Sequence, residues 1–338
     1  MLPQDGILSH ADEAAISLLA DFLPDKIFDM HMHYRLPSFS PAGFKPGGAA
    51  TIVGNAVTMD TYIRDHSRFY PNKENIQANL IIVPDKQMLS EPQMRRLAVE
   101  CLCDELNRHP GCVGEIPVLS TDTREDVEKL LVHPRIRGFK CYHVTANKDN
   151  TWQCTIGEYL PEAVWEIANE RGLCITLHMV RDLALADEAN MEYICTMAGK
   201  YPNAKLILAH AARGFAAWTA VESVEKVAKY QNVYFDLSAV CEPTAFIAII
   251  KTCGHKRVFW GSDYPVSMMR GTCVSIGADF LWLYREQLEA CSSKTNFAPY
   301  LIGIQNLMAM RTACKLLDLD KKTVEDIFYN NAIEFFGL

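Results

Sequence analysis

The chain has 338 residues, enough for one barrel-sized domain or two ordinary ones. Apolar residues make up 49% and charged residues 22% of it, and the mean hydropathy is -0.02, a composition typical of soluble globular proteins. The net charge of -8 argues against nucleic acid or an anionic membrane as the main partner.

The N-terminal segment, residues 1–25, has no basic region before an apolar run, so we interpret it as a helical extension rather than a signal peptide. An amphipathic helix is predicted at about 11–23. Apolar runs such as 245–250 are too short to span a bilayer. The 12 cysteines lack C-x-x-C spacing and several lie in apolar runs, which favours reduced buried thiols over disulfides or a thiolate metal site. We therefore expect a cytoplasmic protein.

Eight apolar runs have the length and composition of β-strands, at 26–33, 77–83, 112–118, 136–142, 172–178, 204–210, 232–238 and 257–263. Helix-periodic stretches separate them, among them 90–111, 123–134, 160–172 and 190–202. Strands that alternate with helices pair in parallel through right-handed crossovers. Eight such units predict a closed (β/α)8 TIM barrel of the α/β class, with C-terminal helices, in a single domain over 1–338.

Three connections are longer than ordinary loops, and each follows a strand: 34–58, 143–158 and 264–300. Loops after strands lie at the C-terminal face of a barrel, where barrel enzymes keep their active sites. The first connection is rich in proline and glycine and is a candidate lid.

Five side chains of metal-binding type stand at or near the ends of these strands: His31, His33, His178, His210 and Asp263. A single His-x-His pair is a weak signal, because the chain has 10 histidines and chance produces such pairs. In a barrel, however, these strand ends converge around one axis. Imidazoles with one carboxylate are the donor set that zinc and similar ions prefer.

The remaining histidines are interpreted as surface or packing residues, except His143, whose role is left open. The histidines assigned to the surface or to packing are His10, His66, His109, His133 and His255. Because side chains alternate along a strand, Met32 between the first two candidate ligands should face the outer helices.

The sequence resembles the amidohydrolase superfamily, in particular the branch that includes aminocarboxymuconate semialdehyde decarboxylase and related metal-dependent TIM-barrel hydrolases. The resemblance runs nearly end to end and is carried by FDMHMH, NRHPGCVGEIPVL, IRGFKCYH, GLCITLH, YPNAKLILAHAARG, NVYFDLS, RVFWGSDYP and IFYNNAIEFFGL. The segments LILAHAARG and FWGSDYP are specific to it. The loop after His178 reads MVRD where many relatives have a Thr-Gly turn, so the substrate pocket is expected to differ from that of the decarboxylase.

The resemblance implies that His31, His33, His178 and Asp263 ligate a divalent ion, zinc first, with one ion expected and two as the alternative. Asp263 would also take a proton from metal-bound water. His210 would polarise the substrate and shuttle a proton, or complete a second metal site. Barrels of this family commonly self-associate, which is consistent with a homodimer.

Lys140 on the fourth strand has three interpretations: a group that faces the substrate, a carboxylated bridge between two metals, and a structural residue. Glu115 on the third strand must find a partner inside the barrel, and an ion pair with Lys140 is the simplest expectation.

Arg181 and Arg213 each lie three residues after a candidate site histidine. A planar guanidinium suits a carboxylate, which predicts a small anionic substrate. The alternative is that they pair with Asp182, Asp187 or Glu188 to hold the loop.

Three functions follow from these features. The first is hydrolysis of a lactone, ester or amide by metal-activated water. The second is non-oxidative decarboxylation of an unsaturated or aromatic acid, and the third is a metal-bearing barrel without catalytic activity.

Overall fold

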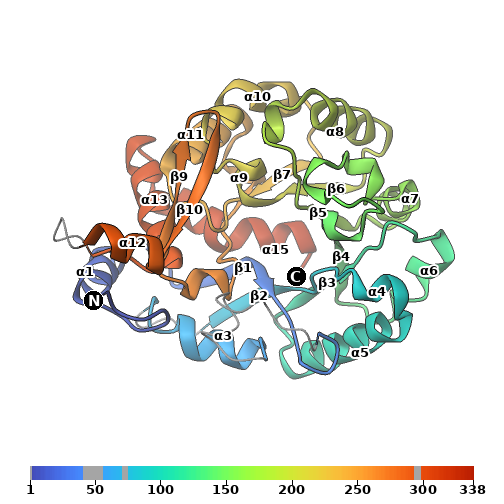
Figure 1. The fold of residues 1–338 in the computed structure, drawn as a ribbon, viewed down its shortest axis with the longest axis horizontal. Helices are drawn as coiled ribbons and strands as arrows, with labels where there is room; N and C mark the ends of the chain where they lie inside the picture. The colour runs from blue at the N-terminus through green and yellow to red at the C-terminus, as the bar shows by residue number, and fades with distance from the viewer. Residues whose placement is uncertain (1, 41–55, 71–74, 293–297) are drawn as a thin grey trace.

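The structure, a computed structural model, describes residues 2–40, 56–70, 75–292 and 298–338. Eight parallel strands form one sheet in the order of the chain, β1 to β8 (Figure 1). Their bounds are Lys26–His33, Asn75–Ile81, Val113–Pro117, Ile136–Cys141, Cys174–Leu177, Lys205–Leu208, Val233–Asp236 and Val258–Phe259. The predicted TIM barrel is therefore confirmed, and each predicted strand matches an observed one.

Backbone hydrogen bonds between β1 and the segment that follows β8 close the barrel. The Met30 amide donates to the Trp260 carbonyl at 3.0 Å, and the Asp263 amide donates to the His31 carbonyl at 2.8 Å. A bulge in β1 between Asp29 and Met32 shifts its register against β2. This closure brings the ends of the first and eighth strands, and the candidate ligands on them, to one edge.

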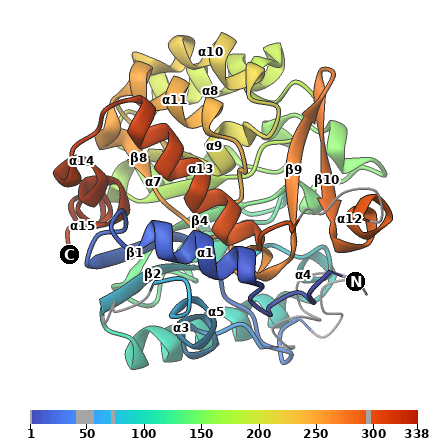
Figure 2. The same ribbon diagram turned by 90° about the vertical axis from the view of Figure 1, so that its left-hand side faces the viewer.

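Helices surround the barrel, with bounds α1 His10–Leu19, α3 Met59–His66, α4 Gln87–Ser90, α5 Pro92–Arg108, α6 Arg124–Glu128, α7 Glu162–Arg171, α8 Glu188–Lys200, α10 Trp218–Ala228, α11 Pro243–Cys253, α12 Arg285–Ser292, α13 Ile302–Leu316, α14 Lys321–Glu325 and α15 Asn331–Phe336. The label α9 covers the turn Ala209–Arg213. Figure 2 shows α1 alongside α13, so a helix from near the start of the chain packs against one from its last quarter. No helix among the described residues is both long and apolar enough to cross a membrane.

The apolar core has two parts. A large cluster joins the outward side chains of the strands to the helices, and Met32 belongs to it, as predicted. A smaller cluster inside the barrel contains Phe28, Val113 and Phe259 and is covered by Phe335 and Phe336 of α15. The last helix therefore closes the end of the barrel opposite the strand ends that carry the histidines.

The connection 264–300 differs from the predicted long loop. It folds as an antiparallel hairpin, β9 Gly271–Ile276 with β10 Asp279–Tyr284, followed by α12. Gly277 turns the hairpin with a φ of 61°, a conformation that costs glycine little. The signal for these strands was β-branched and aromatic residues at alternate positions, at 272, 274 and 276 and again at 280, 282 and 284.

The other two connections and one helix also show local differences. Three short 3-10 turns lie in 143–158: η1 His143–Thr145, η2 Thr151–Gln153 and η3 Ile156–Glu158. A capping box between Thr123 and Asp126 starts α6, but this helix ends at Glu128, whereas the predicted helical stretch runs to 134. Most of the candidate lid, residues 41–55, lies outside the described residues. Its two flanks pair through Arg35 and Val57.

Candidate metal centre

Three candidate ligands meet at the C-terminal end of the barrel. His31 and His33 extend from β1, and Asp263 lies just after β8. Asp263 Oδ1 is 2.8 Å from His33 Nε2 and 3.7 Å from His31 Nε2. His31 is fully buried, and the side chains of His33 and Asp263 are 13% and 10% exposed, so the group opens toward solvent on one side only.

The spacing of these atoms suits a metal ion. One ligand atom from each of the three residues lies within 4.8 Å of the others. Ligands about 2.0 Å from a tetrahedral ion stand about 3.3 Å apart, between the two distances measured here. His33 Nδ1 is buried and has no hydrogen-bond partner among the described residues. Two imidazoles and a carboxylate thus fit a divalent ion with room for a further ligand.

A second group lies behind the first and shares His31 with it. His31 Nδ1 is 2.9 Å from Asp236 Oδ2, at the end of β7. Ser238 Oγ lies 2.9 Å from His210 Nδ1 and donates a short hydrogen bond to Asp236. The rings of His31 and His210 are stacked with centroids 4.9 Å apart. Asp236 is therefore connected to both histidines.

His178, the fourth predicted ligand, is not part of either three-residue group. Its Nδ1 is 3.1 Å from His210 Nε2, and its ring packs against Tyr142 at 4.7 Å. The structure thus places it next to the site through His210, while its predicted role as a ligand stays a prediction.

Burial keeps His31, His178 and His210 neutral at physiological pH. It lowers the pKa of His31 to about 3, and it also lowers the pKa of His178 and of His210. Burial opposes ionisation of Asp263, but His210 and His33 outweigh it and lower the pKa of Asp263 to about 2. These three imidazoles are therefore neutral and the Asp263 carboxylate is ionised, the protonation states that metal ligands need.

The backbone at the site adopts left-handed conformations that residues with a Cβ seldom occupy. In the turn after β6, φ is 56° at His210, 53° at Ala211, 59° at Ala212 and 56° at Arg213. Asp263 has a φ of 57°. Such strain costs roughly 1–2 kcal/mol per residue and concentrates at functional sites.

Lys140 is fully buried next to the three candidate ligands His31, His33 and Asp263, with its Nζ 3.1 Å from His31 Nε2. Burial lowers the pKa of its ammonium group. The expected ion pair with Glu115 does not form: Glu115 accepts hydrogen bonds from Asn79 at 2.6 Å and Thr176 at 2.7 Å. These neutral donors leave burial as the dominant influence, which raises the pKa of Glu115 to about 7.

The two candidate substrate arginines have different surroundings. Arg181 Nε lies 2.8 Å from Asp187 Oδ2, and Nη1 donates to the Gln153 carbonyl, so this side chain holds its loop. Arg213 donates to the Arg181 carbonyl at 2.7 Å, and its guanidinium carbon lies 4.9 Å from the ring centroid of Phe280 and 5.9 Å from that of Trp152. The positive charge of Arg213 contributes to the low pKa of His178, which places it within electrostatic reach of the site.

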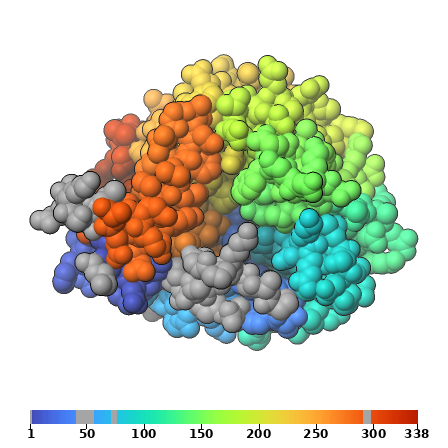
Figure 3. All heavy atoms as spheres, in the orientation of Figure 1, coloured from blue at the N-terminus to red at the C-terminus, as the bar shows by residue number. Residues whose placement is uncertain are grey.

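Aromatic side chains of the β9–β10 hairpin form one wall of the site. Phe215 stacks on His210 at 5.5 Å, and Phe280 and Trp282 pack against Phe215 at 4.8 and 5.3 Å. Figure 3 shows this face hollowed between the hairpin, in orange, and the green segment that contains η1 to η3. His143 belongs to this green side, where it accepts or donates a 2.8 Å hydrogen bond with Thr151 Oγ1.

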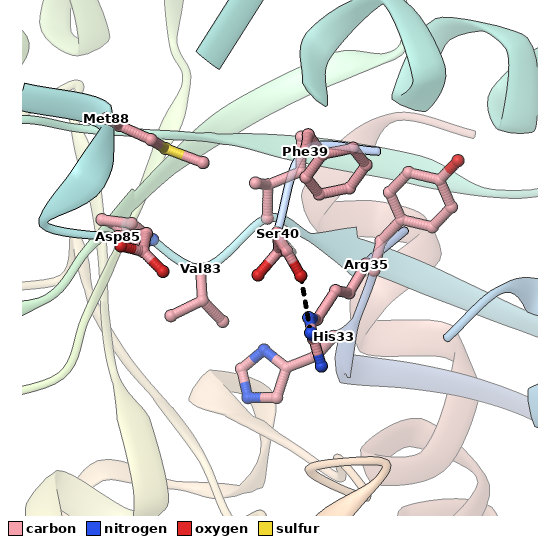
Figure 4. A pocket seen from close by; sticks show the side chains of 10 residues that line it. His33, Arg35, Phe39, Ser40, Val83, Asp85 and Met88 are labelled. Atoms are coloured by element: carbon pink, nitrogen blue, oxygen red, sulfur yellow. Dashed lines mark hydrogen bonds between the residues drawn. The ribbon is translucent and has the colours of Figure 1, made fainter. Parts of the chain in front are cut away.

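A cavity of about 150 Å³ opens beside His33 on the β1–β2 side (Figure 4). Phe39, Val83 and Met88 supply apolar surface, while Arg35 and Asp85 supply opposite charges. Arg35 Nη2 donates to the Ser40 carbonyl at 2.7 Å. Of the three candidate ligands, His33 lines this cavity, whose walls are both polar and apolar.

Sequence reasoning missed Asp236, Ser238 and the aromatic hairpin. Asp236 could have been found, because FDLS ends the seventh strand with a carboxylate in the same position as the other candidate ligands. The hairpin residues carried no such signal, since they lie far from the histidines in sequence.

Comparisons with known proteins agree with this architecture. The amidohydrolase family model matches residues 92–338. An L-fucono-1,5-lactonase from Burkholderia ambifaria is 26% identical over 186 residues, which are 50% of this chain and 60% of the lactonase.

Three solved structures have a similar fold at low sequence identity. An amidohydrolase from Burkholderia multivorans with bound zinc is 12% identical, with a TM-score of 0.57, and the match covers 93% of this chain and 99% of that one. 5-Carboxyvanillate decarboxylase from Novosphingobium aromaticivorans, complexed with manganese, is 14% identical with a TM-score of 0.60, covering 93% and 96%. 2,6-Dihydroxybenzoate decarboxylase from Rhizobium is 13% identical with a TM-score of 0.59, covering 92% and 98%. These structures share the fold, and the family match covers most of the chain, which therefore belongs to the amidohydrolase family.

Proposed function

We propose that this protein is a metal-dependent hydrolase that opens a lactone, ester or amide bond in a small substrate bearing a carboxylate. The observation that carries this proposal is the meeting of His31 Nε2, His33 Nε2 and Asp263 Oδ1 at the open end of the barrel. His178 joins them as the proposed fourth ligand. Two imidazoles with a carboxylate favour zinc, and the related structures contain zinc or manganese.

Asp263 and His210 have different proposed roles in proton transfer. A bound divalent ion polarises a carbonyl and lowers the pKa of a coordinated water to about 7. Asp263 is the proposed proton acceptor: its lowered pKa of about 2 keeps the carboxylate ionised at neutral pH, and the acidity that a bound metal would give its water would drive the transfer. His210 is the proposed second proton carrier, because it lies 3.1 Å from His178 and stacks on His31.

Arg213 is the proposed anchor for the substrate carboxylate. Its side chain is buried, and the rings of Phe280 and Trp152 lie within cation–π distance of the guanidinium and favour its positive charge. Arg181 supports it indirectly, through the carbonyl that accepts the Arg213 hydrogen bond. Lys140 is fully buried and its Nζ contacts His31 Nε2, so it does not face a surface that a substrate could reach. We therefore propose Arg213, rather than Lys140, as the residue that contacts the substrate. A carboxylated Lys140 with two metals stays an alternative form of this site.

The second candidate function is non-oxidative decarboxylation at one metal. The similarity to a lactonase in sequence favours hydrolysis, whereas the decarboxylases share only the fold. The aromatic wall of Phe215, Phe280 and Trp282 is the observation that favours an aromatic or unsaturated acid.

The test begins with metal analysis of purified protein, where we expect about one zinc or manganese ion per chain. His33→Ala should remove it, because a ligand is lost, while the control His133→Ala at an exposed site bonded to Asn107 should not. A panel of sugar lactones and aromatic acids is then assayed for acid release and for carbon dioxide. Acid release without carbon dioxide supports hydrolysis, and the reverse supports decarboxylation. A metal-free wild-type protein that stays metal-free after incubation with zinc would contradict both.

A further inference from the structure

We propose that Asp236 and Ser238 are positioning residues that set the tautomers of the site histidines before the metal binds. The inference rests on the proposed function only in its premise that His31 is a ligand. Both residues are buried at the end of β7, with exposed fractions of 1% and 0%. Neither lines the cavity beside His33, so their contribution is exerted through His31 and His210.

The hydrogen bonds to Asp236 leave only one arrangement for His31. Asp236 Oδ1 accepts from the Ser238 amide at 3.0 Å and from the Ser238 hydroxyl, while Oδ2 faces His31 Nδ1 at 2.9 Å. An ionised carboxylate only accepts hydrogen bonds, so His31 must carry its proton on Nδ1. Its Nε2 then presents a lone pair, the form that binds a metal. Lys140 Nζ, a donor when charged, lies 3.1 Å from this same Nε2 and agrees with that assignment.

Ser238 fixes the tautomer of His210 in the same way. Its hydroxyl proton is committed to Asp236, so toward His210 Nδ1 it offers only acceptors: Oγ at 2.9 Å and the backbone carbonyl at 3.3 Å. His210 must therefore hold its proton on Nδ1 and leave Nε2 bare. His178 Nδ1, at 3.1 Å from that bare nitrogen, must in turn be the donor, and its own Nε2 is freed. One carboxylate thus orders the protons of three imidazoles.

The isosteric change Asp236→Asn tests this directly. An amide has one acceptor oxygen and one NH2 donor, but the site needs acceptors on both sides. If the oxygen faces Ser238, the NH2 faces His31 Nδ1 and moves the imidazole proton to Nε2. We expect zinc affinity to fall about 10- to 100-fold, the range for partners of ligating histidines.

Two measurements follow the variant. Competition with a chromophoric chelator gives the zinc affinity, and nitrogen NMR of histidine-labelled, metal-free protein reports the tautomers without reference to activity. Asp122→Asn is the matched control, because this buried carboxylate pairs with Arg95 outside the site. Thermal unfolding of each metal-free protein shows that the fold is retained. Unchanged zinc affinity and unchanged imidazole shifts in Asp236→Asn would overturn the inference.

Variants of Ser238 test the contact between its hydroxyl and His210 separately from the contact between Asp236 and His31. Ser238→Ala should shift the His210 nitrogen signals, lower kcat more than it changes KM, and weaken zinc binding less than Asp236→Asn does. Ser238→Thr keeps the hydroxyl and should restore the wild-type signals. Ser267→Ala is the matched control, since this buried hydroxyl bonds His66 at 2.7 Å away from the site. If Asp236→Asn does not fold, the Ser238 variants provide the test. Unchanged nitrogen NMR signals of His210 in Ser238→Ala would then contradict the inference.

The two proposals fail in different ways. A wild-type protein that binds no zinc but shows the expected Nδ1–H tautomers contradicts the proposed function, while the assignment of the tautomers to Asp236 and Ser238 stands. A wild-type protein that binds zinc, with variants that bind it equally well, contradicts the positioning role alone.

Discussion

At the scale of single residues, the turn after β6 combines backbone strain with two charged or titratable groups. His210 and Arg213 both have left-handed backbone angles, and the residues between them are alanines, which have the smallest side chains that still carry a Cβ. The turn directs His210 toward His31 and Arg213 toward the aromatic pair. Strain of this kind persists only where surrounding contacts hold it, here the fully buried Ala211 and Ala212.

Arg213→Ala should raise KM for the identified substrate by about 10- to 100-fold, because a hydrogen bond to a charged group contributes roughly 1.5–3 kcal/mol. Metal content should not change, since Arg213 contacts no candidate ligand. Arg181→Ala serves as the comparison and should act more weakly, because its guanidinium already pairs with Asp187. Steady-state kinetics and metal analysis of both variants check this. Equal KM values for wild type and both variants would rule out carboxylate binding by these arginines.

At the scale of elements, the site depends on the close approach of the segment after β8 to β1. Gly261 permits it: a Cβ at this position would lie 2.9 Å from His31 Cβ and 3.1 Å from the His31 amide nitrogen. Ser238 Cβ, at 3.3 Å, is the third neighbour. The same glycine thus sets the spacing of β1, β7 and the Asp263 segment.

Gly261→Ala should therefore move His31 and weaken both metal binding and folding. Overpacking of this kind costs typically about 1–3 kcal/mol. Gly199→Ala in α8 is the control, because the added Cβ would meet only Tyr230 at an ordinary 3.4 Å and helices favour alanine. Chemical denaturation and zinc titration are the measurements. Wild-type zinc affinity in Gly261→Ala would show that this contact does not position His31.

The helix α3 carries a buried histidine that couples folding to pH. His66 is fully buried, with Nδ1 3.0 Å from Tyr70 Oη and Nε2 2.7 Å from Ser267 Oγ. Burial lowers the pKa of His66 from 6.5 to about 3. Between these values the unfolded chain binds a proton that the folded chain does not, so this contribution to stability is complete above pH 6.5 and declines as the pH falls.

The unfolding free energy of wild type should accordingly fall by about 2 kcal/mol more than that of His66→Gln between pH 6.5 and pH 5. The comparison uses denaturation midpoints of the two proteins at each pH. His10→Gln, at an exposed histidine, should follow wild type throughout. A constant difference between wild type and His66→Gln would mean that the folded protein tolerates the charged imidazole.

At the scale of the whole molecule, the barrel is open at one end and closed at the other. Phe335 and Phe336 of α15 enter the apolar cluster inside the barrel, and Phe335 packs on Tyr234 and Phe259 at 4.8 and 5.0 Å. Near the N-terminus, the buried pair of Asp12 and Arg270 ties α1 to the hairpin region. The chain's last helix and its first thus hold the barrel from opposite sides.

Phe335→Ala should cost about 3–5 kcal/mol of unfolding free energy, the range for removing a buried phenylalanine. Zinc binding by the folded fraction should be retained, because this residue lies at the end of the barrel opposite the site. Leu316→Ala is the control, since this side chain is 69% exposed and surface changes seldom exceed about 0.5 kcal/mol. Denaturant unfolding gives both values, and a loss below 1 kcal/mol would contradict the role of α15.

The sequence alone determined the fold class, all eight strands and the residue types at their ends. Strand and helix periodicities are local, so the run of apolar strands is readable without tertiary information. Once a barrel is inferred, its geometry brings His31, His33 and Asp263 together, although their roles still depend on metal binding.

Only the tertiary structure decided which side chains meet. It showed that Asp236 and Ser238 connect His31 to His210, that Glu115 has neutral partners, and that Arg181 holds a loop while Arg213 lies beside the site. It also turned the expected loop at 264–300 into a hairpin that supplies an aromatic wall. These features arise from contacts between residues far apart in the chain and from rotamers fixed by packing, neither of which leaves a periodic signal in the sequence.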